Sequence, residues 1–249
     1  MIALLVLLGL SLTTAIVLTC LVSYWLRQRT LRGMLPPPPP SERGGLFPRP
    51  GFRPALYHQP SRWLAIKSTD LAEVQEAFGL HNPTPCSWEE GLARSQEHKL
   101  FIFPPLAGWI LVMGSGLPEP DEDIDDFYRF IVGLSRKLGH VQFFSSNRVL
   151  YHHAWIRADS GRVLRAYAWA GEVLWNQGMM TPAEIDLGMR CHQYGEHAGG
   201  SRLPGSSAGQ ANAEKVPQLA ARWSLDPMAI DERLFRRSQG IAGEPSKSF

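Results

Sequence analysis

The stretch "YHHAWIRADSGRVLRAYAWAGEVLW", residues 151–175, contains a predicted antiparallel hairpin. Two runs rich in aromatic and β-branched residues flank the turn sequence "ADSGR", in which Gly161 suits the left-handed position of a three-residue loop. The runs "VQFFSS" before the hairpin and "EVLWNQ" after it are also typical of strands. Four successive strands with short connections predict an antiparallel sheet.

A register that places Ala158 opposite Arg162 gives this hairpin two unlike faces. One face carries mostly small and aliphatic side chains and would suit a covering helix: His152, Ala154, Ile156, Leu164, Ala166 and Ala168. The other carries aromatic and basic side chains, here named the hairpin face: Tyr151, His153, Trp155, Arg165, Tyr167 and Trp169. Trp, Tyr and Arg dominate binding hot spots, so the hairpin face is a candidate binding surface. The alternative is a second core layer, covered by the first loop and a C-terminal helix.

The helix that would cover the aliphatic face is predicted within residues 121–139, "DEDIDDFYRFIVGLSRKLG". Its apolar residues recur at spacings of three and four, which places them on one side: Ile124, Phe127, Ile131, Leu134 and Leu138. Acidic residues precede them, basic residues follow them, and Gly139 ends the run. The helix dipole explains this charge order without a cation site.

Further elements precede and follow these. Residues 62–68 and two apolar runs within 99–116 are predicted strands, and residues 69–80 are predicted as a helix that ends at Gly79. Downstream, Thr181, Pro182 and Glu184 form a capping box with its favoured proline. Together these patterns predict an α+β domain with an antiparallel sheet covered by helices, over residues 62–195. Residues 196–249 are predicted to hold a flexible segment, a short docking helix that contacts the domain through Leu219 and Trp223, and a tail.

The N-terminal segment predicts the compartment. Residues 2–26 contain no charged side chain and are long enough to cross a bilayer once. Arg27, Arg29 and Arg32 follow directly, so the positive-inside rule places the domain in the cytoplasm at the plasma (inner) membrane. We therefore expect residues 1–33 to be a single-pass transmembrane anchor with a basic flank. A cleaved signal peptide is less consistent, because no basic residue precedes the run and no A-x-A site ends it.

Residues 34–61 connect the predicted anchor to the domain. Five successive prolines, Pro36 to Pro40, favour a stiff polyproline II conformation. A proline-rich linker of this kind indicates a spacer that holds the domain away from the bilayer. The alternative is a docking site for a proline-recognising partner domain.

Composition and motifs exclude several classes of function. The formal net charge is +2, and no basic stripe indicates a nucleic-acid partner. No nucleotide-binding motif or nucleophile elbow occurs, so no cofactor and no catalytic residue are predicted. His152 and His153 are adjacent on a strand and point to opposite faces, which argues against a shared metal ion. The odd number of cysteines, Cys20, Cys86 and Cys191, suits a reducing compartment and leaves one Cys86–Cys191 bridge open.

Two functional hypotheses follow from these observations. The first is a membrane-anchored, non-enzymatic binding protein, which contacts the lipid bilayer through residues 2–26 and a protein or peptide partner through the hairpin face. The second is a hydrolase-like enzyme in which His152 or His153 meets a cysteine or a carboxylate beside the hairpin of residues 150–170. The partner, the substrate and the oligomeric state do not follow from the sequence.

Overall fold

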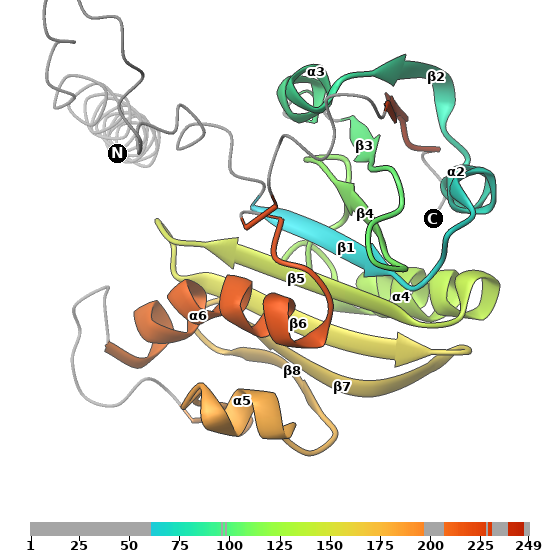
Figure 1. The fold of residues 1–249 in the computed structure, drawn as a ribbon. Helices are drawn as coiled ribbons and strands as arrows, with labels where there is room; N and C mark the ends of the chain where they lie inside the picture. The colour runs from blue at the N-terminus through green and yellow to red at the C-terminus, as the bar shows by residue number, and fades with distance from the viewer. Residues whose placement is uncertain are drawn as a thin grey trace, which may run out of the picture. The chain divides into compact units, whose positions relative to one another are not determined.

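A nine-stranded antiparallel sheet forms the centre of the domain in the computed structural model (Figure 1). The described residues are 61–95, 97, 99–196, 207–227, 229–230 and 239–246. The strand order is β2-β9-β3-β4-β1-β5-β6-β7-β8. The strands are β1 (Arg62–Ile66), β2 (His81–Cys86), β3 (Leu100–Ile102), β4 (Ile110–Met113), β5 (Val141–Asn147), β6 (His152–Asp159), β7 (Arg162–Trp169), β8 (Val173–Gln177) and β9 (Gly240–Glu244). The predicted α+β class with an antiparallel sheet is confirmed.

Helices cover both faces of this sheet. On one face, α2 (Leu71–Phe78) and α4 (Ile124–Leu138) pack into an apolar core. On the other face, α3 (Trp88–Arg94), α5 (Pro182–Asp186) and α6 (Ser207–Trp223) cover a second, more aromatic core. Figure 1 shows α6 and α4 on opposite sides of the central strands. Cover of the second face corresponds to the alternative considered for the hairpin, a second core layer beneath a C-terminal helix.

Helix α4 forms as its sequence pattern predicts. The side chain of Asp123 caps its start by accepting hydrogen bonds from the backbone N–H groups of Asp125 and Asp126. Its buried face includes Phe127 and Ile131. These residues share one core with the small side chains of β6 and β7, which are Ala154, Ile156, Ala158, Ala166 and Ala168. The helix thus covers the aliphatic face of the hairpin.

The hairpin register differs from the predicted one by one residue next to the turn and by two residues beyond a bulge. The turn has only two central residues, because Ser160 and Gly161 both adopt positive φ angles, 48° and 79°. Asp159 pairs with Arg162, and His153 pairs with Trp169. A bulge interrupts the pairing at Leu164, because Ala158 pairs with Val163 and Arg157 pairs with Arg165. Leu164 is therefore exposed and does not pack beneath α4. Both strands otherwise keep the predicted division into an aliphatic and an aromatic face.

Two strands at one side of the sheet were not predicted. The sequence of β2 contains Pro83 and Pro85, which lack a backbone N–H group and are uncommon within a sheet. Because β2 pairs only with β9, it is an edge strand, where proline is tolerated. Strand β9 comes from the segment predicted as a tail. Its Gly240 leaves space for the ring of Phe101, since a Cβ atom there would lie 2.3 Å from that ring.

Helix α6 runs from Ser207 to Trp223 and continues through Pro217, so it is longer than the short docking helix that the sequence predicted. Leu219 is buried against the sheet, and the ring of Trp223 lies 5.8 Å from the ring of Phe144, centroid to centroid. The helix therefore packs on the second face through the two residues that the sequence indicated.

The predicted anchor of residues 2–26, the linker up to residue 60 and a brief helix expected at 232–237 lie outside the described residues. In the part of the chain that the structure describes, no helix is long and apolar enough to cross a membrane.

Candidate functional site

The hairpin face lies inside the domain. His153, Trp155, Arg165, Tyr167 and Trp169 are all buried, and Tyr151 is half-buried at the end of β6. The rings of Trp155 and Tyr167 lie 4.8 Å apart between centroids, and His153 stacks beside them. This is the arrangement of the second core layer considered above: α6 is the C-terminal helix expected over it, and α5 packs on the same core. A partner would have to displace these helices to reach the hairpin face.

Glu184 connects α5 to this layer. It is the third residue of α5, where its Oε2 accepts hydrogen bonds from the backbone N–H and the hydroxyl of Thr181, as the predicted capping box requires. Its Oε1 accepts from the indole N–H of Trp155 at 2.7 Å and from Nε of Arg165 at 2.9 Å. The carboxylate is fully buried, and the Arg165 guanidinium supplies its counter-charge.

The remaining donors of Arg165 are also used. Its Nη1 donates to the side-chain oxygen of Asn176 and to the backbone carbonyl of Ala166, both at 2.9 Å. Its Nη2 lies 3.0 Å from the Sγ of Cys191. Burial raises the pKa of the Cys191 thiol to about 12, against the opposing effect of Arg165. The thiol is therefore protonated at neutral pH, which argues against a nucleophilic role. Cys191 and Cys86 are both free, so the bridge left open above is not formed.

His153 is held as the neutral imidazole. Its Nδ1 lies 2.9 Å from the carbonyl oxygen of Tyr151 and its Nε2 lies 3.4 Å from the amide nitrogen of Asn212, which suits a proton on Nδ1. Burial lowers the pKa of His153 from its ordinary 6.5 to about 4, although the Tyr151 carbonyl opposes this shift. A general base with so low a pKa in a closed core has no access to a substrate proton.

The low pKa of His153 predicts a pH-dependent stability. The unfolded chain binds a proton near pH 6.5 and the folded chain only near pH 4, so stability is full above pH 6.5 and falls as the pH decreases between these values. We expect His153→Gln to remove on the order of 3 kcal/mol of this pH dependence, measured by denaturant unfolding from pH 7 to pH 4. Equal slopes for wild type and His153→Gln would contradict the assignment.

Of the two adjacent histidines at the start of β6, His152 is the one that contacts a carboxylate. Its Nδ1 lies 2.9 Å from Oδ2 of Asp121, and both line a small cavity together with Ser145. That cavity has a volume of about 10 Å³, which holds about one water molecule and no substrate. No group of three or more potential metal ligands was found among the described residues.

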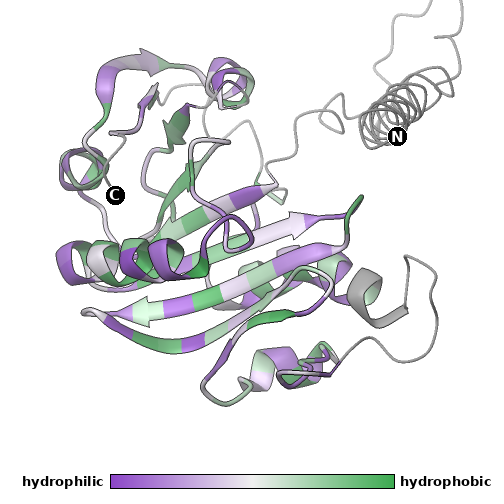
Figure 2. Cartoon of the chain, turned by 180° about the vertical axis from the view of Figure 1, so that it is seen from behind, coloured by the Kyte–Doolittle hydropathy of each residue, from purple (hydrophilic) through white to green (hydrophobic). Residues whose placement is uncertain are grey.

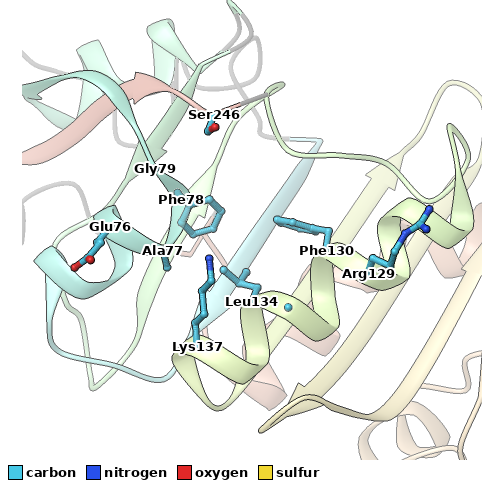
Figure 3. A pocket seen from close by; sticks show the side chains of 10 residues that line it. Glu76, Ala77, Phe78, Gly79, Arg129, Phe130, Leu134, Lys137 and Ser246 are labelled. Atoms are coloured by element: carbon cyan, nitrogen blue, oxygen red, sulfur yellow. The ribbon is translucent and has the colours of Figure 1, made fainter. Parts of the chain in front are cut away.

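The open site of the domain lies on the other face of the sheet, between α2 and α4, and is here named the α2–α4 groove. It has a volume of about 230 Å³. The rings of Phe78 and Phe130, whose centroids are 6.5 Å apart, close its base beside Leu134 (Figure 3). Glu76, Arg129 and Lys137 line its rim, and Ser246, which follows β9, lies at one end.

Gly133 keeps this groove open. It stands in the interior of α4, where glycine destabilises a helix by about 0.5–1 kcal/mol relative to alanine. A Cβ atom added at Gly133 would meet no heavy atom of the described domain within 4 Å, apart from the neighbouring backbone of α4. Close packing therefore does not require glycine here, in contrast to Gly91 on α3, where a Cβ would lie 2.3 Å from the Phe101 ring. The missing side chain at position 133 contributes directly to the space of the groove.

The two edge strands of the sheet, β2 and β8, are poor sites for the addition of a partner strand. Edge strand β2 contains two prolines and cannot donate at those positions. At edge strand β8, the backbone N–H of Asn176 donates to the hydroxyl of Tyr194 at 2.8 Å, and the side chain of Asn176 donates to the carbonyl of His192. Addition of a partner strand is thus disfavoured at both edges.

No family model, curated protein or solved structure matches the chain significantly.

Proposed function

We propose that this chain is a membrane-anchored, non-enzymatic binding protein, whose domain accepts one apolar side chain of a protein or peptide partner in the α2–α4 groove. The observation that carries the proposal is Gly133, a helix-interior glycine whose absent side chain would meet no neighbouring group and which lines an open groove of about 230 Å³. Residues 2–26 would supply the anchor at the plasma membrane, with the domain in the cytoplasm.

The size of the groove supports a side chain rather than a cofactor or a drug-sized substrate. Pockets for such ligands span roughly 300–1,000 Å³, and the groove has about 230 Å³. Its base consists of aromatic and aliphatic side chains, which favour an apolar group.

The charges at the rim favour a partner with an acidic residue beside its apolar one. Lys137 is exposed and reaches from α4 toward the end of α2 (Figure 3). Arg129 is already paired with Asp126 on its own helix. Lys137 is therefore the cation best placed to attract a carboxylate.

The partner can be captured and the groove tested in the full chain. A photo-crosslinking amino acid in place of Glu76, at the rim of the groove, should form adducts with the partner in native membranes, and one in place of exposed Leu164, which does not line the groove, should not. A peptide with the crosslinked sequence then serves as the ligand for binding measurements. Adducts that form equally from both positions would contradict the proposal.

Two substitutions of Gly133 make a matched pair for this peptide. Gly133→Trp should fill the groove and weaken binding at least about tenfold, a loss of about 1.4 kcal/mol. Gly133→Ala should keep the affinity and increase the free energy of unfolding by about 0.5–1 kcal/mol, because alanine suits a helix interior better. Titration calorimetry and denaturant unfolding measure the two effects. Equal affinity of both variants would contradict binding in the groove.

The hydrolase-like alternative rests on His152 and Asp121, which form a histidine–carboxylate pair beside Ser145. A reaction there would need space for a substrate next to Ser145, whereas the cavity has about 10 Å³. The α2–α4 groove, with about 230 Å³, is large enough for a partner's side chain, whereas the cavity beside His152, with about 10 Å³, is too small for a substrate. These volumes favour a binding protein over a hydrolase-like enzyme.

A further inference from the structure

The connection between β5 and β6, residues 148–151, exposes two successive aliphatic side chains. Val149 is 84% exposed and Leu150 is 58% exposed. This connection is here named the tip. Figure 2 shows it as a hydrophobic end of the sheet. We infer that the tip contacts a lipid bilayer, with Val149 and Leu150 in the interfacial region of a zwitterionic membrane.

The backbone of the tip is held in one conformation by local hydrogen bonds. The side-chain oxygen of Asn147 accepts from the backbone N–H groups of Val149 and Leu150, each at 3.0 Å. Tyr151 then adopts a positive φ of 58°, which is uncommon for a residue with a bulky side chain. The two aliphatic side chains are thus presented to the outside by a defined turn, and neither packs into the core of the domain.

The tip lies where the N-terminal part of the chain enters the domain. The backbone N–H of Ser146 donates to the carbonyl of Ser61 at 2.7 Å, and Ser145 pairs with Arg62 at the start of β1. Figure 1 shows the start of β1 and the β5–β6 connection at the same end of the sheet. The 60 residues that precede Ser61 include the predicted membrane segment, so the domain is joined to its anchor beside the tip.

The charges near the tip select the kind of bilayer. Arg148 is exposed within the tip and suits a lipid phosphate. The acidic start of α4 lies at the same end, since Asp121 contacts His152 and Asp123 caps the helix. These carboxylates would be repelled by a strongly anionic surface. A phosphatidylcholine bilayer, which carries both charges in each headgroup, therefore suits the tip better than an anionic one.

This inference rests on the proposed membrane anchor and is independent of the α2–α4 groove. Two aliphatic side chains give a free domain little affinity for a bilayer. An anchor in the same chain turns this weak contact into an intramolecular one and raises the effective concentration of the bilayer at the tip. The linker of residues 34–61 would then act as a tether that lets the tip reach the bilayer, and not as the spacer expected from its prolines. The consequence is a preferred orientation of the domain, with this end of the sheet toward the membrane.

Depth-dependent fluorescence quenching tests the contact in the full chain. A dansyl-bearing amino acid in place of Val149 should be quenched strongly in phosphatidylcholine vesicles whose acyl chains are brominated, because interfacial apolar groups lie about 5–10 Å into the bilayer. The same label in place of Leu164, an exposed aliphatic residue in the bulge of the β6–β7 hairpin, is the matched control and should keep its fluorescence.

Each outcome of this experiment decides the inference. Strong quenching at 149 together with little at 164, and weaker quenching at 149 in anionic phosphatidylserine vesicles, would support it. Equal signals at the two positions in a chain that floats with the vesicles would overturn the contact of the tip and leave the anchor intact. A chain that does not float with the vesicles would overturn the anchor and the tip together. Burial of the 149 label without quenching by brominated lipid would indicate a protein partner and would also overturn the inference.

Discussion

Glu184→Ala is expected to destabilise the domain by about 3–5 kcal/mol, because it leaves the Arg165 guanidinium buried without a counter-charge. The same change removes the acceptor of the Trp155 indole N–H and half of the capping box of α5. The free energy of unfolding of the full chain, measured in denaturant at pH 7, reports the loss. The Glu184 carboxylate accepts hydrogen bonds from Trp155, from Arg165 and twice from Thr181. Alanine at position 184 would leave these donors without that acceptor.

A matched control lies on the same short helix. Asp186 pairs with Arg222 at 3.3 Å, but its side chain is 68% exposed. Asp186→Ala should therefore cost less than about 1 kcal/mol, as is usual for exposed pairs. A double variant, Arg165→Met with Glu184→Met, should recover much of the loss, because it removes both charges together. Similar losses for Glu184→Ala and Asp186→Ala would contradict the buried pair.

Phe127→Ala is expected to destabilise the domain by about 3–5 kcal/mol, the range for deletion of a buried aromatic side chain. Phe127 is fully buried, and its ring lies 4.8 Å from Phe143 and 6.4 Å from Trp175, centroid to centroid. The substitution would leave a cavity between α4 and the aliphatic face of the hairpin. Denaturant unfolding at constant pH measures the change.

The next residue of the same helix provides the comparison. Tyr128 is 45% exposed and contacts Trp175 only at its edge, with the ring centroids 5.6 Å apart. Tyr128→Ala should cost less than about 1 kcal/mol, as expected for a mostly exposed side chain. A larger loss for Tyr128→Ala than for Phe127→Ala would mean that α4 presents a different face to the sheet.

The elements with strong local signals were predictable from the sequence. Helix α4 follows from apolar residues at spacings of three and four between an aspartate cap and Gly139. The start of α5 follows from Thr181, Pro182 and Glu184. In each case neighbouring residues determine the structure, and the tertiary contacts add to a local preference.

The missed elements depend on contacts between distant residues. Strand β9 is five residues long and contains two glycines, and it forms because β2 and β3 pair with it. Strand β2 is favoured only by its position at the edge of the sheet. The hairpin register could not be predicted because the sequence around Gly161 suits both a three-residue loop, as expected, and the observed turn with two central residues.

The burial of the hairpin face could not be read from its residues. Aromatic and basic side chains suit a binding surface and a core layer equally well, and the cover comes from α6, whose residues begin 38 positions after Trp169. The guanidinium of Arg165 is compatible with this core only because Glu184 accompanies it. For the α2–α4 groove, the signal in the sequence was a glycine at position 133 inside an otherwise strongly amphipathic helix. Its meaning depends on the position of α2, which the sequence did not provide.

The central claim is that the partner binds in the α2–α4 groove and not at the hairpin face. The most direct test uses the captured peptide with a photoreactive leucine analogue in place of its apolar residue, bound to the wild-type full chain, and locates the adducts by mass spectrometry. We expect adducts within residues 76–79 and 129–137, which line the groove. Adducts within residues 151–169, with none in the groove, would contradict the account.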